Sequence, residues 1–247
     1  MNIYAIINQK GGVGKTTTAV NLSAGLALEG YKVLLIDCDP QGNATQSLKR
    51  EPEDEEPTLY EVLKGKADIN DAIKGGDFDI LPTDIRLSAA ELELTSVPAR
   101  ELLLKDAIAG IKGKYDFIIL DCAPSLSVLT LQALVACSAF IIPVQAAYLP
   151  LKGIKQLLDT VALIKRLNQS LELLGVVVTM YNGSRVLDKE IYGNISDYFN
   201  GNILAEIPNN IALAEAQAVE QDVFSYAPTS KGAEAYKKLV KEVIKRS

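Results

Sequence analysis

The chain of 247 residues contains no histidine. Histidine is the most common general base near neutral pH and the most common metal ligand, so its absence excludes a Ser-His-Asp triad and a histidine-bound metal. Any chemistry must therefore be carried out by lysine, carboxylate, hydroxyl or backbone amide groups. Long apolar runs are also missing, since none approaches the roughly 20 residues that are needed to cross a bilayer.

Cysteines are few, and basic residues are outnumbered by acidic ones. Cys38, Cys122 and Cys137 are an odd number without the spacing of paired metal ligands, which predicts reduced thiols in a cytoplasmic protein. The excess of acidic residues gives a net charge of −6. A field of that sign repels DNA and anionic lipid, so binding of either would need a local basic patch.

Short runs rich in Ile, Leu and Val alternate with longer segments whose apolar residues have helical spacing. The runs predict strands at residues 3–8, 32–37, 78–82, 115–121, 139–144, 174–180 and 203–208. The predicted helices include 16–29, 99–111, 152–168, 186–199 and 230–247. This alternation is typical of a doubly wound, mostly parallel α/β sheet flanked by helices. No repeat or linker divides the chain, so we expect one domain over residues 1–247.

The segment "INQKGGVGKTTTA" at residues 7–19 contains a glycine-rich loop. The general phosphate-binding pattern is G-x-x-x-x-G-K-[ST], and residues 14–16 match its second half. Gln9 stands where the first glycine is expected, and Lys10 is a second lysine that the pattern does not require. The loop follows a predicted strand and opens a predicted helix, which is the context that a phosphate-binding loop needs.

This context predicts a nucleotide site. Backbone amides of the glycines can turn toward phosphate oxygens, and the helix N-terminus adds the positive end of its dipole. Lys15 is expected to reach the β- and γ-phosphates, and the Thr16 hydroxyl to bind Mg²⁺. The predicted nucleotide-binding residues of the loop are Lys10, Gly11, Gly12, Val13, Gly14, Lys15, Thr16 and Thr17.

Three acidic residues follow predicted strands. Asp121 ends the apolar run of "FIILDCAPS", where a carboxylate commonly belongs to the Mg²⁺ shell. Asp37 and Asp39 end the run of "LLIDCDPQGNAT". Two carboxylates beside a triphosphate repel it unless a cation or a proton-transfer role compensates. The pair therefore predicts a switch loop that senses the γ-phosphate, and either acid is a candidate to orient water.

These motifs closely resemble those of the ParA/Soj partition ATPases, which belong to the deviant Walker A class of P-loop NTPases together with MinD. The motifs that carry the resemblance are "KGGVGKTT" at 10–17, "DCDPQGNAT" at 37–45 and "ILDCAPS" at 119–125. Further similar segments are found at 79–94, 206–216 and 230–239, so the resemblance covers the whole chain.

The resemblance implies a slow, Mg²⁺-dependent ATPase that works as a dimerisation switch. Such a protein uses ATP and Mg²⁺ as cofactors and forms a homodimer that encloses two nucleotides. It partitions plasmid or chromosomal DNA, or positions another cargo, through nucleotide-gated, nonspecific binding to double-stranded DNA. A ParB-like centromere-binding protein is the implied partner, and the implied location is cytoplasmic and nucleoid-associated.

The resemblance also assigns roles to individual residues. Lys10 contacts the ATP of the partner subunit, Lys15 contacts the ATP of its own subunit, and Asp39 positions the attacking water. These three are the predicted catalytic residues. The predicted Mg²⁺ residues are Thr16, Asp37 and Asp121, and the residues implied to line the adenine are Asn182, Pro208 and Asn209.

DNA contacts are expected from exposed basic residues. ParA/Soj sequences often carry such residues in the segment that matches 208–216, where this chain has none. The candidates that remain are Arg185, Lys189, Lys231, Lys237, Lys238, Lys241, Lys245 and Arg246.

Two other functions stay open at this point. One is a MinD-like ATPase that cycles on membranes through a basic amphipathic C-terminal helix. We expect the apolar face of the C-terminal helix, with Tyr236, Leu239 and Val243, to dock on the sheet instead, so a membrane is an unfavoured partner. The other is a biosynthetic P-loop enzyme that acts on a small substrate.

Overall fold

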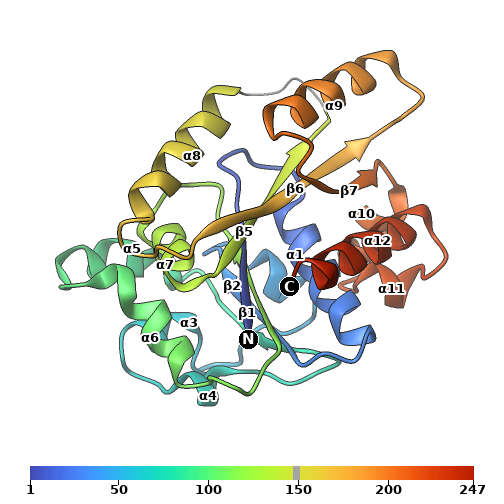
Figure 1. The fold of residues 1–247 in the computed structure, drawn as a ribbon. Helices are drawn as coiled ribbons and strands as arrows, with labels where there is room; N and C mark the ends of the chain where they lie inside the picture. The colour runs from blue at the N-terminus through green and yellow to red at the C-terminus, as the bar shows by residue number, and fades with distance from the viewer. Residues whose placement is uncertain (147–150) are drawn as a thin grey trace.

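A computed structural model describes residues 1–146 and 151–247, and in these residues seven strands form one parallel sheet (Figure 1). The strand order is β3-β2-β4-β1-β5-β6-β7, and each neighbouring pair is parallel. The strands are β1 (Asn2–Ile6), β2 (Val33–Cys38), β3 (Asp79–Leu81), β4 (Phe117–Cys122), β5 (Ala139–Gln145), β6 (Glu172–Tyr181) and β7 (Ile203–Pro208). All seven strands that the apolar runs predicted are confirmed.

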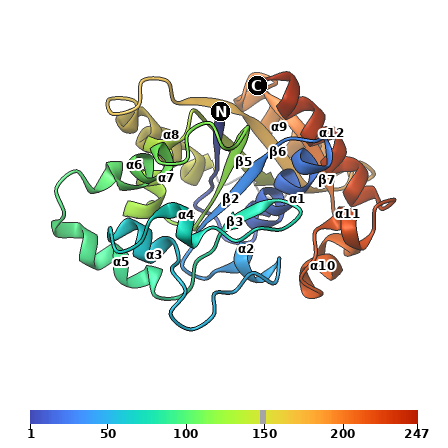
Figure 2. The ribbon, with the colours of Figure 1, turned by 90° about the horizontal axis from the view of Figure 1, so that it is seen from below.

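Helices cover both faces of the sheet (Figure 2). The buried residues on one face pack with α1 (Lys15–Leu28), α11 (Val223–Tyr226) and α12 (Lys231–Lys245). Those on the other face pack with α3 (Leu59–Leu63), α4 (Ile69–Ala72), α5 (Leu87–Glu93), α6 (Leu103–Ala109), α7 (Val128–Ala136), α8 (Leu151–Ile164) and α9 (Val186–Tyr198). Every residue of β2 and β4 is buried, which explains why these strands read as continuous apolar runs.

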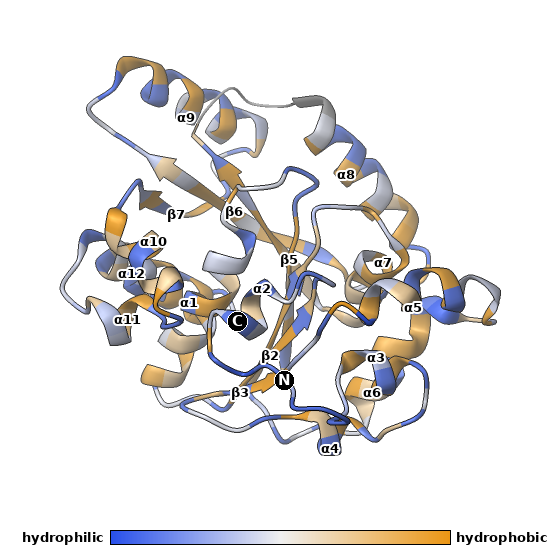
Figure 3. Ribbon diagram, turned by 180° about the vertical axis from the view of Figure 1, so that it is seen from behind, coloured by the Kyte–Doolittle hydropathy of each residue, from blue (hydrophilic) through white to orange (hydrophobic). Residues whose placement is uncertain are grey.

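Figure 3 shows the apolar strands at the centre of the molecule, with polar residues on the outer sides of the helices. The remaining elements are short. They are α2 (Asn43–Gln46), α10 (Ile211–Ala218), and the 3-10 turns η1 (Leu94–Ser96) and η2 (Arg100–Leu102).

The structure corrects two of the predicted helices. The helix predicted at 99–111 is a 3-10 turn followed by the shorter α6, because Ala99 has a left-handed backbone (φ 53°) that no helix can include. The helix predicted at 152–168 ends at Ile164. The C-terminal helix and the helix predicted at 186–199 are confirmed within a few residues at each end.

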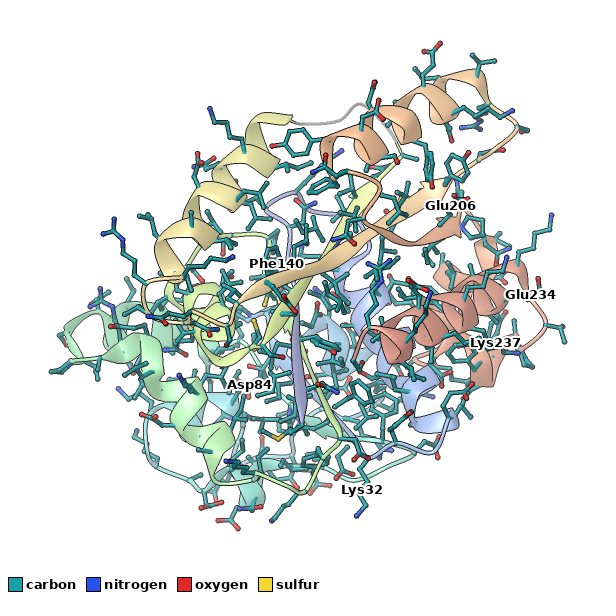
Figure 4. The ribbon with its side chains drawn as sticks, viewed as in Figure 1. Lys32, Asp84, Phe140, Glu206, Glu234 and Lys237 are labelled. Carbon is teal, nitrogen blue, oxygen red and sulfur yellow. The ribbon has the colours of Figure 1, made fainter. Side chains whose placement is uncertain are left out.

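The apolar face of α12 docks as predicted. Tyr236, Leu239 and Val243 are each at most 1% exposed, within the core cluster that also includes residues of α1. α1 approaches α12 so closely that a Cβ atom at Gly25 would overlap Val240. Figure 4 shows Glu234 and Lys237 on the outer side of α12.

The last two residues tie the C-terminus to the sheet. The Arg246 guanidinium donates hydrogen bonds to the carbonyl oxygens of Leu174 (2.9 Å) and Ile203 (3.3 Å). The Tyr4 hydroxyl of β1 donates to Ser247 Oγ at 3.1 Å. The two ends of the chain therefore meet. Within the described ranges, every helix is too short or too polar to cross a lipid bilayer.

Candidate nucleotide-binding site

The glycine-rich loop connects β1 to α1 at the carboxyl edge of the sheet. β1 lies between β4 and β5, so the loop emerges near the middle of this edge. Gly12 (φ 71°) and Gly14 (φ 86°) have left-handed backbones, which other residues adopt only with strain. A Cβ atom at Gly11 or Gly12 would meet no other atom within 4 Å, so their backbone faces open space. A phosphate group can therefore approach the amides of this loop directly.

Asn8 of the loop and Thr179 of β6 hold the loop in this shape. Asn8 Nδ2 donates to the carbonyl oxygen of Pro143 in β5 at 2.7 Å, and Asn8 Oδ1 accepts from the Lys10 amide at 3.0 Å. Thr179 Oγ1 of β6 donates to the carbonyl oxygen of Val13 at 2.9 Å. Val13 is 1% exposed, so only its backbone is available to a ligand.

The two lysines of the loop lie in different environments. Lys15 is buried, and its Nζ donates to the carbonyl oxygen of Lys10 at 3.1 Å. Burial lowers the pKa of Lys15, while the nearby carboxylates of Asp121 and Asp39 favour its charged form. Lys10 is exposed, and its Nζ donates to Gln145 Oε1 at 3.3 Å. One cation thus lies inside the site, whereas the other is exposed to solvent.

Asp37 and Asp121 are cross-strand neighbours in β2 and β4, and both are fully buried. Asp37 Oδ2 accepts from the Thr45 amide and the Thr45 hydroxyl, both at 2.8 Å, and Asp37 Oδ1 accepts from the Asp39 amide at 3.2 Å. Burial raises the pKa of Asp37 to about 6, against the effect of these hydrogen bonds.

Asp121 differs from Asp37 because neither of its carboxylate oxygens has a hydrogen-bond partner in the described residues. Burial, followed by the charge of Asp37, raises the pKa of Asp121 well above its ordinary value. The Thr16 hydroxyl lies near enough to oppose this rise, although it makes no hydrogen bond of ordinary geometry. A buried carboxylate without a partner is costly. Thr16, Asp37 and Asp121 are oxygen donors of the kind that Mg²⁺ binds, so they fit that cation.

Asp39 lies at the start of the predicted switch loop and is 7% exposed. Its Oδ1 accepts from the Gln41 amide at 3.0 Å, and its carbonyl oxygen accepts from the Gly42 amide at 2.8 Å. Gly42 has a left-handed backbone (φ 66°) and precedes α2. This turn holds the Asp39 carboxylate against the same cavity as the glycine-rich loop.

That cavity has a volume of about 350 Å³, within the usual range for small-molecule sites. Its lining comprises Gly11, Gly12, Gly14, Lys15, Thr16, Thr17, Asp39, Asn43, Pro124, Met180 and Gln217. Four of these were not predicted from the sequence, namely Asn43, Pro124, Met180 and Gln217. Asn43 and Pro124 stand inside the quoted motifs and could have been included. Met180 and Gln217 carry no local signal, because only the folding of the chain brings them there.

The residues implied to line the adenine lie together at the ends of β6 and β7. Tyr181 pairs with Pro208 in the sheet, so Asn182 and Asn209 follow directly on adjacent strands. Asn182 Oδ1 accepts from the amide (3.1 Å) and the hydroxyl (2.7 Å) of Ser184. These bonds fix the side-chain amide and leave its NH₂ group to donate to a base. Asn182, Pro208 and Asn209 do not line the cavity of the glycine-rich loop but lie beside its Met180 wall.

Comparisons with known proteins match this architecture. A family model described as an AAA domain matches residues 1–173. Over 246 residues the chain is 46% identical to the sporulation initiation inhibitor protein Soj of Bacillus subtilis, covering 98% of this chain and 97% of that protein. The chain belongs to the ParA/Soj family.

Solved structures confirm the predicted fold class for this member of the ParA/Soj family. One neighbour is cobyrinic acid a,c-diamide synthase from Mycobacterium smegmatis with bound ADP and magnesium. It has a TM-score of 0.87 and 34% identity, and the match covers 99% of this chain and 94% of that one. Another is the cell division ATPase MinD from Pyrococcus furiosus, with a TM-score of 0.82, 29% identity, and coverage of 100% and 99%.

The basic residues predicted to contact DNA divide into two groups in this ParA/Soj-family structure. Arg185 and Lys189 are exposed at the start of α9, and the lysines of α12 are exposed along its outer side. Arg246 differs from the rest, because its guanidinium also donates to Glu242 at 2.7 Å in addition to the two backbone carbonyls. Contact between Arg246 and DNA would require these structural bonds to break.

Proposed function

We propose that this chain is a Mg²⁺-dependent partition ATPase, a single domain over residues 1–247, in which ATP closes a homodimer and hydrolysis releases it. The observation that carries the proposal is the pair of loop lysines. Lys15 lines the cavity near the acids, whereas Lys10 is exposed and does not belong to the lining. Because Lys10 does not line the cavity of its own subunit, its charge is not needed to hold a nucleotide there. It is suited to the nucleotide of a facing subunit.

The proposed reaction assigns one task to each group. The loop amides and Lys15 hold the phosphates, and Lys10 adds positive charge from the facing subunit where charge develops in the transition state. Thr16, Asp37 and Asp121 would hold Mg²⁺, which neutralises the phosphate oxygens and orients them. Asp39 orients the attacking water.

Exposed apolar side chains support an interface at this edge of the sheet. Met180, Val186, Leu187 and Ile211 are 37%, 73%, 64% and 73% exposed. Met180 lines the cavity, and the other three begin the helices that follow β6 and β7. Single exposed apolar residues are ordinary, but a group of them beside a ligand cavity is typical of a surface that becomes covered.

Replacing Lys10 by alanine is expected to preserve ATP binding and to abolish the ATP-dependent dimer, because only the charge that serves the facing subunit is lost. Light scattering with ATP and Mg²⁺ measures the dimer, and a fluorescent ATP analogue measures binding. Lys114→Ala is the matched control, since Lys114 lies on the loop before β4, at the opposite edge of the sheet. A Lys10→Ala protein that dimerises like the wild type would rule out the trans role.

Nonspecific DNA binding is proposed for the dimer, as part of partitioning plasmid or chromosomal DNA with a ParB-like partner. Binding is expected with ATP, weaker with ADP, and to fall steeply with salt as phosphate contacts release counterions. Dimerisation places two copies of each basic group on one duplex, which strengthens weak contacts. Replacing Lys237, Lys241 and Lys245 by glutamate should weaken binding equally for unrelated sequences and leave the dimer intact. Binding to fluorescent duplexes at two salt concentrations measures this effect. An ATP-bound dimer that has no affinity for DNA at low salt would contradict the proposed nonspecific DNA binding.

Two other functions, a MinD-like membrane cycle and a biosynthetic enzyme, have relatives among the structural neighbours. A MinD-like membrane cycle needs a free apolar helix face, and the apolar residues of α12 are buried. Sedimentation with anionic liposomes and ATP tests this alternative. A biosynthetic role is favoured by the name of the Mycobacterium smegmatis neighbour. ATP turnover that rises with DNA and a ParB-like protein, and not with small metabolites, separates the partition ATPase from the enzyme.

A further inference from the structure

Thr45 makes two hydrogen bonds to one carboxylate oxygen. Its amide and its hydroxyl both donate to Asp37 Oδ2 at 2.8 Å, and Thr45 is 1% exposed. Asp37 Oδ1 receives only the longer bond from the Asp39 amide, at 3.2 Å. Thr45 therefore fixes the direction of the Asp37 carboxylate and leaves Oδ1 as its less occupied oxygen.

The same hydroxyl is also an acceptor. The amide of Thr83, in the loop after β3, donates to Thr45 Oγ1 at 3.1 Å. Because a hydroxyl has one hydrogen, which Thr45 gives to Asp37, the Thr83 amide meets a lone pair. The bonds form a directed chain from Thr83 through Thr45 to Asp37. A Cβ atom at Gly42 would lie 3.3 Å from the Thr83 carbonyl oxygen, so the switch loop and the Thr83 loop are in close contact.

The far end of the Thr83 loop is also held. The Arg86 guanidinium donates to Asp84 Oδ2 at 2.7 Å through one nitrogen and at 2.9 Å through another. It also donates to Glu61 Oε1 of α3 at 3.0 Å. Figure 4 labels Asp84. The Thr83–Arg86 loop is thus anchored to α3 at one end and to the switch loop at the other.

We propose that Thr45 is a positioning residue, which aims Asp37 at the Mg²⁺ shell and ties the switch loop to the Thr83 loop. The inference rests on the proposed function, since that function places Asp37 in the Mg²⁺ shell. The inference also distinguishes the two buried acids, Asp37 and Asp121, by the hydrogen bonds that each of them receives. Asp37 is oriented by protein hydrogen bonds, whereas neither carboxylate oxygen of Asp121 has a hydrogen-bond partner in the described residues. Partners that orient a metal-binding group typically change metal affinity about 10- to 100-fold when they are removed.

The test compares Thr45→Val, which keeps the shape and loses the hydroxyl, with Thr45→Ser, which keeps the hydroxyl. Affinity for fluorescently labelled ADP is measured with Mg²⁺ and with EDTA, and the ratio of the two gives the coupling to Mg²⁺. Thr45→Val should lose about 10- to 100-fold of this coupling and retain metal-free ADP affinity, while Thr45→Ser should match the wild type. Thr18→Val is the matched control, because its hydroxyl is fully buried and contacts Tyr236 instead.

A second readout follows the Thr83 amide by hydrogen exchange. Its protection should be lost in Thr45→Val and retained in Thr45→Ser and Thr18→Val. If Thr45→Val does not fold, Thr45→Ala takes its place under the same criteria. If the variant without the hydroxyl shows the same coupling of ADP affinity to Mg²⁺ as the wild type, the inference is overturned. Full protection of the Thr83 amide in that variant also overturns it. Neither result bears on the proposed function. A wild-type protein whose ADP affinity ignores Mg²⁺ overturns the Asp37 assignment and the inference together.

Discussion

Asp39→Ala is expected to lower ATP turnover by about 10² to 10⁴-fold, which is the usual cost of losing a group that handles the proton of the attacking water. The Asp39 carboxylate is held at the cavity by the Gln41 amide, and it is not one of the groups proposed to hold the phosphates. ATP binding and the dimer should therefore persist. Phosphate release under saturating ATP measures turnover, and light scattering measures the dimer.

The matched control for this experiment is Asp197→Ala, since Asp197 is exposed on α9 and does not line the cavity. Its turnover should equal that of the wild type. Normal turnover by Asp39→Ala would assign the water to another group. Loss of ATP binding in Asp39→Ala would show instead that the carboxylate shapes the site.

Lys15→Ala is expected to weaken ATP binding by at least about 100-fold. Each hydrogen bond to a charged group contributes about 1.5–3 kcal/mol, and Lys15 is proposed to make such bonds to two phosphates. About 1.4 kcal/mol corresponds to a tenfold change in affinity. The loss of two such hydrogen bonds therefore weakens binding by more than about 100-fold. Equilibrium binding of a fluorescent ATP analogue measures the loss, and circular dichroism confirms that the variant is folded.

Lys10→Ala serves as the control for Lys15→Ala within the same loop. It removes a cation five positions away while leaving the buried one, so its monomeric affinity for ATP should stay near that of the wild type. Equal losses in the two variants would contradict the separate cis and trans roles. Near-wild-type binding by Lys15→Ala would remove Lys15 from the site.

The centre of the sheet was predictable because β2 and β4 are buried on both faces. That burial forces these strands to be apolar along almost their whole length, so the pattern is visible without knowledge of the neighbours. The 3-10 turn at Arg100–Leu102 was not predictable. The residue with the left-handed backbone before it is Ala99, whereas glycine or asparagine would have indicated this conformation in the sequence.

The site was predictable where one motif carries both the backbone shape and the chemistry, as in residues 10–17. It was not predictable where the partners come from distant segments. Thr45 stands inside a recognised motif, yet its partner Thr83 lies 38 residues away. The sequence also presents Arg246 as one more cation of a basic helix, and only its distance to backbone carbonyls shows that it anchors the chain.

The meeting of the two chain ends has a consequence for synthesis. Tyr4 of the first strand contacts Ser247, and β1 pairs with β4 and β5, whose residues are translated more than 100 positions later. A nascent chain therefore holds its central strand β1 without a paired neighbour until more than 100 further residues have been synthesised. The sheet face that α12 covers stays incompletely buried until residues 231–245 have been added. Closing the sheet around β1 is thus a long-range step, and the apolar strands that wait for it are exposed to aggregation in the meantime.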